Sequence, residues 1–291
     1  MNRPTKMHKL TGWTSLTSTL ISTFLLSAPV AYASWFHRKE KLVWQEKFKP
    51  HGSPRPDPAI WSYDEGGDGW GNGELEFYCA YGSSKRPCDP ASPNAFVGKD
   101  GFLHIVARKI PDGRFTSARL LSHKLKTFQY GRFEARIRVP AGQGMWPAFW
   151  LLGEDIDQVK WPACGELDVM ENIGKLPDTI YGSVHGKGFT GTAISTSTKL
   201  PNGTPFASGF HTFGMIWRPG SISYYVDDPH RPYIIDTPKD LPAGAVWPFD
   251  GGRFFLLLNL AVGGGWPGSP DSSTTFPSEM LVDYVKVWEL K

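Results

Sequence analysis

Residues 130–139 alternate strictly between apolar and polar side chains. The apolar set is Phe133, Ala135, Ile137 and Val139, and the polar set is Arg132, Glu134, Arg136 and Arg138. Because successive side chains of a strand point to opposite faces of a sheet, this pattern predicts a strand with one face in a core and one polar face. Short alternating runs recur between clusters of Gly and Pro along the chain, which is typical of an all-β sandwich or barrel.

The first 33 residues have the three parts of a secretory signal peptide. These parts are a basic start with Arg3, Lys6 and Lys9, a mildly apolar stretch at residues 20–30, and an A-x-A cleavage site, Ala31-Tyr32-Ala33, before Ser34. The apolar stretch is too short and too rich in Ser and Thr for a permanent transmembrane helix. We therefore expect a secreted protein, periplasmic or extracellular, with no membrane partner after cleavage. An uncleaved membrane anchor is the alternative.

The remaining residues, 34–291, are expected to form one β-sandwich domain, since all-β domains of this size are common. A later apolar run, residues 254–262, has only the length of a strand and is interrupted by Asn259. The formal net charge of the whole chain is +3, and its basic residues are scattered. We therefore expect no nucleic-acid partner, and we expect a monomer.

Residues 165–172, with the sequence G-E-L-D-V-M-E-N, carry three carboxylates in an otherwise apolar segment. In a strand, Glu166 and Asp168 share one face, whereas Glu171 falls on the other. A one-residue bulge at Val169 or Met170 would return Glu171 to the face of the other two, and bulges are frequent beside active sites. The segment therefore predicts three acids in a row on one surface.

Crowding like charges on one strand face costs stability, so a functional reason is expected. Two carboxyl groups, one protonated and one ionised, are the equipment of glycoside hydrolysis. A separation of about 5–5.5 Å between them would make the enzyme retaining. The alternatives are an exposed acidic strand or a cluster of calcium ligands.

Five segments together resemble glycoside hydrolase family 16, and most closely its bacterial laminarinase-like endo-β-1,3-glucanases. They are residues 69–75, 130–136, 144–150, 161–171 and 259–268, and the resemblance extends from about Leu42 to Glu289. It implies a β-jelly-roll sandwich of two antiparallel sheets, of the concanavalin A type, with a concave substrate cleft. It also implies that residues 34–291 are a catalytic domain that needs no organic cofactor.

The resemblance also implies roles for individual residues. Glu166 is expected to be the nucleophile, Glu171 the general acid and then base, and Asp168 the residue that holds the nucleophile's charge state. Further expected sugar contacts are Asn72, Glu134, Arg136 and His185. The alternatives are a turn residue for Asn72, an outward salt-bridge ladder for Glu134 and Arg136, and a structural role for His185, which could also donate to a catalytic carboxylate.

The chain has 12 Trp residues, and several lie beside Pro or Gly in expected loops. Flat indole rings suit the CH faces of sugars, while their N–H groups can reach hydroxyls, so we expect a carbohydrate ligand. We assign substrate contacts to the four Trp residues inside the family-like segments: Trp146, Trp150, Trp161 and Trp266.

The three cysteines are Cys79, Cys88 and Cys164. The first two flank a short loop and are expected to form a disulfide in an oxidising compartment, which leaves Cys164 as a buried free thiol.

Asp283 and Glu46 lie in phase with apolar neighbours of their segments, so each needs a partner. The resembled family often holds a structural calcium between acids near the two chain ends and backbone carbonyls. We therefore assign a calcium site to Glu46, Asp283 and the carbonyl of Gly101. This chain has Glu46-Lys47 where the family usually has Asp-Glu, and salt bridges are the alternative.

The expected activity is hydrolysis of internal β-1,3-glucosidic bonds in a β-glucan such as laminarin. A mixed-linkage β-1,3-1,4-glucanase and a galactan hydrolase acting on agarose or carrageenan are the rival enzymes. A typical mixed-linkage motif is one residue shorter than the acidic segment here, and the W-P-A-C-G-E context of residues 161–166 favours laminarinase. A non-catalytic β-glucan-binding protein is a further alternative, but such a protein is expected to lose a catalytic Glu.

Overall fold

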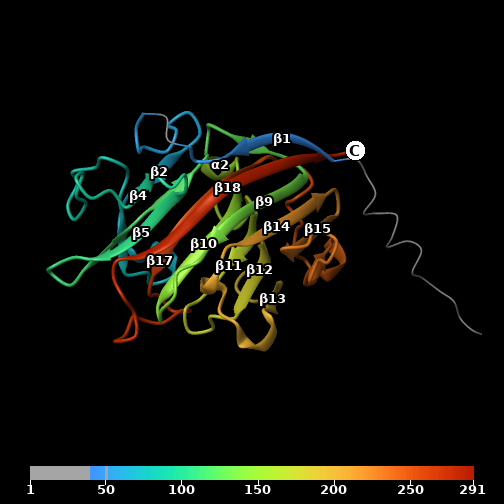
Figure 1. Cartoon of the computed structure of the whole chain (residues 1–291). Helices are drawn as coiled ribbons and strands as arrows, with labels where there is room; N and C mark the ends of the chain where they lie inside the picture. Colours follow the sequence, from blue (N-terminus) through green and yellow to red (C-terminus); the bar gives the residue numbers. More distant parts are fainter. Residues whose placement is uncertain (1–39, 50–51) are drawn as a thin grey trace, which may run out of the picture. The chain divides into compact units, whose positions relative to one another are not determined.

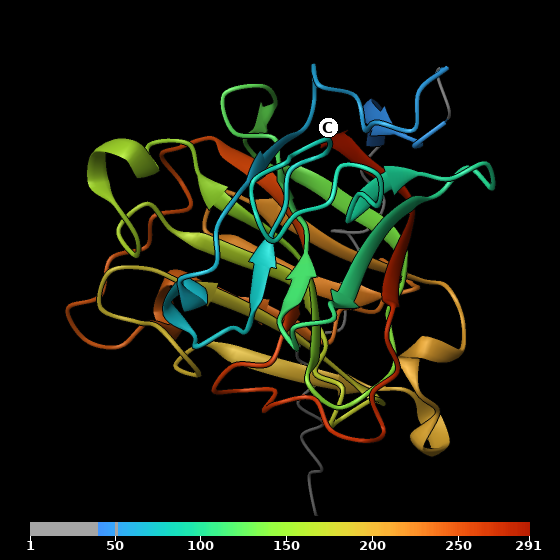
Figure 2. The ribbon, with the colours of Figure 1, turned by 90° about the vertical axis from the view of Figure 1, so that its left-hand side faces the viewer.

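The computed structural model describes residues 40–49 and 52–291, which all belong to one compact unit spanning 38–291. The predicted signal peptide, residues 1–33, lies outside the described residues. Two β-sheets pack face to face (Figures 1 and 2). All strand pairs are antiparallel except the parallel pair β3–β6, so the predicted jelly-roll sandwich is confirmed with one local exception.

The first sheet has the order β16-β15-β14-β9-β18-β5-β6-β3, with β1 added to β18 and β4 to β5. Figure 1 shows β14, β9 and β18 as long neighbouring strands. The bounds of this sheet's strands are β1 (Glu40–Glu46), β3 (Glu76–Tyr78), β4 (Ala95–Val97), β5 (Leu103–Lys109), β6 (Phe115–Ser117), β9 (Gly131–Arg138), β14 (His211–Arg218), β15 (Ser221–Val226), β16 (Ile234–Asp236) and β18 (Ser278–Leu290).

The second sheet has the order β13-β12-β11-β10-β17-β7-β2, with β8 added to β17. Its strands are β2 (Ser62–Asp64), β7 (Arg119–Leu121), β8 (Thr127–Phe128), β10 (Met145–Gly153), β11 (Glu166–Glu171), β12 (Thr179–His185), β13 (Ser195–Lys199) and β17 (Phe254–Val262). The helices are α2 (Ile156–Val159) and the 3-10 turns η1 (Gly69–Gly71), η2 (Pro201–Gly203), η3 (Phe206–Ser208) and η4 (Pro238–Asp240). None of the helices in the described part of the chain could cross a membrane.

The core fills the space between the two sheets and follows the alternation of the strands. Phe133, Ala135 and Ile137 of β9 are fully buried, as the pattern predicts, and they belong to the same cluster as Phe149 and Leu151 of β10. The opposite face of β10 carries Trp146, Ala148, Trp150 and Leu152, which line a cleft. The period of two therefore divides β10 between core and cleft.

The cysteines lie as the sequence predicts. Cys79 and Cys88 form a disulfide with 5.6 Å between their Cα atoms, and Cys164 is a buried free thiol. Burial raises the pKa of Cys164 to about 11, so its thiol is protonated and unreactive at neutral pH.

Candidate active site

The acidic strand β11 contains the expected bulge. Against β10, Asp168 pairs with Trp150 and Met170 with Phe149, so Val169 is the extra residue. The register against β12 shifts between Asp168 and Glu171 as well. Val169 and Met170 are both buried in the core. Two consecutive inward side chains return Glu171 to the face that carries Glu166 and Asp168.

The three acids lie in a cleft with a volume of about 400 Å³. The second sheet forms its floor, while the loop around η1 and the segment from α2 to Trp161 form walls. The lining residues are Trp70, Gly71, Asn72, Glu74, Arg119, Trp146, Ala148, Trp150, Leu152, Ile156, Trp161, Glu166, Asp168, Glu171, Asn259 and Ala261.

Glu166 and Glu171 each accept a hydrogen bond from an indole N–H. Trp161 Nε1 lies 2.5 Å from Glu166 Oε2, and Trp146 Nε1 lies 3.0 Å from Glu171 Oε1. Both Trp residues were expected to contact substrate, and the structure gives them this second contact. An indole N–H can only donate, so it stabilises the charged form of a carboxylate and orients its oxygens.

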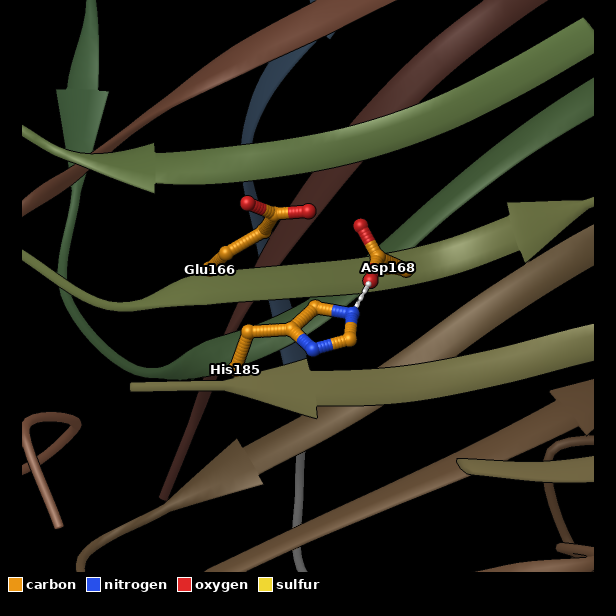
Figure 3. A group of neighbouring side chains, drawn as sticks. All are labelled: Glu166, Asp168 and His185. Carbon is orange, nitrogen blue, oxygen red and sulfur yellow. Dashed lines mark ion pairs between the residues drawn. The ribbon is translucent and has the colours of Figure 1, made fainter. Parts of the chain in front are cut away.

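Glu166 and Asp168 lie side by side on one strand, and His185 on the neighbouring strand points towards Asp168 (Figure 3). His185 Nε2 is 2.9 Å from Asp168 Oδ2, and the His185 side chain is only 12% exposed. His185 is the cross-strand partner of Glu166, which places its ring on the same face of the sheet. His185 thus contacts a carboxylate of the acidic strand, one of the three roles considered for it, and does not line the cleft.

Burial raises the pKa of all three acids. The pKa of Glu171 is raised well above its ordinary value, by burial first and by the charge of Asp168 second. Burial raises the pKa of Glu166 to about 8, with a further rise from Asp168, while His185 and the Trp161 N–H lower it. The pKa of Asp168 is raised to about 7 by burial, and a hydrogen bond with Glu166 lowers it. The three groups therefore hold their protons to higher pH than free carboxylic acids do, and the raised pKa of Glu171 suits it to be an acid.

Glu166, Asp168 and His185 place one ligand atom each within 4.8 Å of one another, a spacing that a metal ion could bridge. The chemistry of the set argues against this role. Calcium prefers six to eight oxygen ligands, whereas one of these three is an imidazole. Glu166 Oε2 also already accepts a hydrogen bond from Trp161. The alternative of a calcium cluster at the acidic strand is therefore not favoured.

The other expected sugar contacts divide between the cleft and its surroundings. Asn72 and Trp150 line the cleft. Trp266 is not among the lining residues, and its ring packs edge-on with Trp146 at 5.3 Å and with Tyr181 at 4.9 Å between centroids. Trp266 therefore supports the Trp146 ring.

The expected place of Glu134 and Arg136 beside the cleft is wrong. Both residues belong to β9 of the first sheet, on the face away from the core. Glu134 accepts hydrogen bonds from Tyr225 and Tyr284, and Arg136 Nη1 lies 2.7 Å from Asp283 Oδ2. These contacts match the alternative of an outward ladder of salt bridges. The alternation predicted a polar face, but it could not specify which of the two sheets carries the cleft.

The residues assigned to a calcium site do not fit it. Glu46 is paired in register with the core residue Val285, whereas Asp283 lies at a bulge of β18 and pairs with the outward-facing Arg136. The two acids thus use opposite faces of the first sheet. Glu46 Oε1 accepts from the backbone N–H of Phe48 at 2.8 Å. The hydrogen bond satisfies the Glu46 carboxylate, and the salt bridge satisfies the Asp283 carboxylate. Because these two acids do not face each other, the carbonyl of Gly101 has no pair of carboxylates with which to bind calcium.

Four polar or aromatic residues of the cleft lining were not assigned from the sequence: Trp70, Glu74, Arg119 and Asn259. Asn259 had a signal, because it interrupts the buried apolar strand β17. Arg119 is the first residue of β7 and has apolar neighbours, Ala118 and Leu120; its guanidinium carbon lies 4.0 Å from the centroid of the Trp70 ring. Glu74 and Trp70 lie in a family-like segment that we used only for Asn72.

A jelly-roll sandwich whose cleft joins two indole-bound glutamates, a central aspartate and several Trp rings defines a glycoside hydrolase. The family model described as Glycosyl hydrolases family 16 matches residues 92–286. The chain belongs to this family.

Proteins that are named as glucanases are similar to this chain over most of its length. The Beta-glucanase of Rhodothermus marinus is 38% identical over 262 residues, which cover 85% of each chain. The Glucan endo-1,3-beta-glucosidase of Cryptopygus antarcticus is 32% identical, with 92% of this chain and 99% of that protein covered. The catalytic domain of an endo-1,3-beta-glucanase (laminarinase) from Thermotoga petrophila has a similar structure, with a TM-score of 0.76, 40% identity, and coverage of 87% of this chain and 99% of that one.

Proposed function

We propose that this protein is a retaining endo-β-1,3-glucanase, with Glu166 as the nucleophile and Glu171 as the general acid and base. The observation that carries the proposal is the bulge at Val169, which brings Glu171 to the cleft face of Glu166. Two carboxyl groups on one side of a Trp-lined cleft supply both parts of a double displacement.

In the first step, Glu171 gives its proton to the glycosidic oxygen while a Glu166 oxygen attacks the anomeric carbon. The bond to the leaving sugar breaks, and a covalent glycosyl-enzyme forms. In the second step, ionised Glu171 takes a proton from water, and the water oxygen attacks the anomeric carbon. Glu166 then leaves as a carboxylate. Two inversions at one carbon retain its configuration.

Asp168 and His185 control the charge state of the nucleophile in this proposal. Glu166 and Asp168 share a hydrogen bond, so one proton between them leaves one negative charge on the pair. The Trp161 N–H donates to Glu166, which favours placing the charge there. His185 faces the other oxygen of Asp168 and supports its position (Figure 3).

The substrate class rests on the relatives, two of which are named for action on β-1,3-glucan. Reducing-end assays on laminarin, barley mixed-linkage glucan, agarose and carrageenan test it, with Glu166→Gln as the inactive control. Laminarin should be the best substrate and should yield oligosaccharides of several lengths. Activity only on barley glucan or on a galactan would support a rival enzyme. Laminarin binding without hydrolysis would support a non-catalytic binding protein.

We also propose that the protein is secreted after removal of residues 1–33. The disulfide between Cys79 and Cys88 supports this, because such bonds persist in oxidising compartments. Amino-terminal sequencing of protein from the culture medium or periplasm should begin at Ser34. Recovery of the full-length chain in the membrane fraction would support the anchor instead.

A further inference from the structure

A buried acid near the cleft has no part in the chemistry proposed above. Glu74 is 8% exposed and is one of the residues that line the cleft. Each of its carboxylate oxygens accepts a side-chain hydrogen bond. Asn72 Nδ2 lies 2.8 Å from Oε1, and the Tyr78 hydroxyl lies 3.0 Å from Oε2. Glu74 is therefore the common acceptor of a cleft residue and a core residue.

The hydrogen bonds continue from Tyr78 to a Trp ring of the cleft. Trp150 Nε1 donates to Asn259 Oδ1 at 2.7 Å, and Asn259 Nδ2 donates to the Tyr78 oxygen at 3.2 Å. An indole N–H can only donate, so Asn259 accepts through Oδ1 and donates through Nδ2, and Tyr78 then donates its hydroxyl to Glu74. The direction of the whole chain, from Trp150 to Glu74, is thus determined by the indole.

Glu76 explains how Glu74 keeps the role of acceptor. Its Oε2 accepts the backbone N–H of Val262 at 2.6 Å. Burial raises the pKa of Glu76 well above its ordinary value, and the charge of Glu74 and a hydrogen bond with it raise the pKa further. Glu76 is therefore easier to protonate than a free Glu, which limits the negative charge that can build up beside Glu74.

The direction of these bonds determines what the cleft offers to a sugar. Because Asn72 turns its Nδ2 towards Glu74, its Oδ1 is not bound to Glu74 and is left for a ligand, together with the second N–H of the amide. Asn72 is exposed, whereas Glu74 beneath it is buried. This wall of the cleft therefore presents an acceptor, which suits the O–H donor of a sugar hydroxyl.

We propose that Glu74 is a positioning residue for glucan binding, acting through the amide of Asn72 and the ring of Trp150. This inference rests on the proposed function, because it concerns how the same cleft binds its glucan. Glu74 lies outside the acid strand and takes no proton in the reaction. Its effect should therefore appear in substrate affinity and not in the chemical step.

The test is Glu74→Gln, which keeps the shape of the side chain but supplies an NH₂ group. Glu74 accepts one hydrogen bond at each carboxylate oxygen, whereas a Gln amide has one oxygen and one NH₂ group. One of the two donors, Asn72 or Tyr78, then faces a donor in place of an acceptor. The Asn72 amide is therefore free to rotate. The KM for laminarin should rise roughly three- to ten-fold, as expected for one lost neutral hydrogen bond, with kcat within about two-fold.

Glu134→Gln is the matched control. Glu134 is also a buried carboxylate that accepts two Tyr hydroxyls, but it lies on the outer face of the other sheet. The Glu134→Gln variant should have a lower melting temperature and an unchanged KM for laminarin. If Glu74→Gln does not fold, Tyr78→Phe removes one donor to the same carboxylate and should raise KM in the same direction.

A double-mutant cycle with Asn72→Ala tests whether Glu74 acts through Asn72. In the Asn72→Ala background, Glu74→Gln should raise KM by much less than it does in the wild type. Fully additive effects, an unchanged KM in folded Glu74→Gln, or an equal KM rise in Glu134→Gln would each overturn the inference.

The affinity of a laminari-oligosaccharide for Glu166→Gln and for Glu166→Gln/Glu74→Gln should show the same loss without any turnover. Wild-type protein that does not hydrolyse laminarin would refute the proposed function. Hydrolysis by the wild type together with equal affinities of these two variants would refute the role of Glu74 alone.

Discussion

Asp168 Oδ2 on β11 lies 2.9 Å from His185 Nε2 on β12, and no other strand lies between them. The pair is almost completely buried, with side-chain exposures of 4% and 12%. Its position beside Glu166 lets a group outside the acidic segment control the charges within it. His185 lowers the pKa of both Glu166 and Glu171.

His185→Gln should move the whole pH profile of kcat/KM to higher pH. The acidic limb reports ionisation of Glu166 and the basic limb reports loss of the Glu171 proton. Loss of His185 removes an interaction that lowers both pKa values, so both limbs should move in the same direction, to higher pH. His211→Gln is the control, because His211 on β14 also pairs with an Asp, Asp227, but lies outside the cleft. A lower rate with unmoved limbs would show that His185 acts only through packing.

Trp161→Phe should affect only the acidic limb. The change keeps a ring but removes the N–H that donates to Glu166, so the pKa of Glu166 should rise. Below the displaced limb, kcat/KM should fall roughly ten-fold or more, the range for a hydrogen bond to a charged group. Trp247→Phe provides the comparison, because Trp247 Nε1 is buried without a partner among the described residues and lies outside the cleft. Equal profiles for the two variants would contradict this role.

Azide should distinguish the roles of the two catalytic glutamates. Glu166→Gly removes the nucleophile, so azide attacks an activated β-glucoside directly and gives the inverted α-azide. Glu171→Gly leaves the nucleophile intact, so azide attacks the covalent intermediate and gives the retained β-azide. NMR identifies the anomers. The opposite assignment would exchange the two roles, and initial release of α-configured sugar by the wild type would refute retention.

The acidic strand should make the protein less stable as the pH rises. The pKa of Glu166 is raised from 4.5 to about 8, so the folded state keeps a proton that the unfolded state has lost across this window. Stability from this group is present below about pH 4.5 and is lost as the pH rises towards 8, with a slope of at most about 1.4 kcal/mol per pH unit. Glu166→Gln cannot titrate and should become more stable relative to the wild type from pH 5 to pH 8.

Urea unfolding at pH 5, 6.5 and 8 measures this difference in the free energy of unfolding. The exposed Glu289→Gln is the control and should follow the wild type at each pH. Parallel curves for the wild type and Glu166→Gln would show that Glu166 is not neutralised by folding.

Local spacing predicted the parts of the site that lie on one strand. The alternation of residues 130–139 predicted a strand with one buried face. The position of Glu171, out of phase with Glu166 and Asp168, predicted a bulge at Val169 or Met170, and the structure has it at Val169. These features follow from the period of two, which the order of side chains alone determines. The loop between Cys79 and Cys88 is likewise a short-range feature.

Tertiary structure decided which surfaces meet. The polar face of β9 has the same pattern as a cleft face, yet it forms salt bridges on the outside of the first sheet. The bulges of β1 and β18 place Glu46 and Asp283 on opposite faces, although their sequence phases look alike. Periodicity says only that a side chain points away from the core, because each sheet of a sandwich has one such face.

The hydrogen bonds that give the acids separate roles are also long-range. Trp146 donates to Glu171 from 25 residues away, and Arg119 and Asn259 reach the cleft from two further strands. The sequence by itself determined that three acids share a strand face in a β-sandwich. The packing of β10, β17 and β7 beside that strand decided which groups surround each acid, since burial and donors depend on neighbouring strands and not on the order of residues within one.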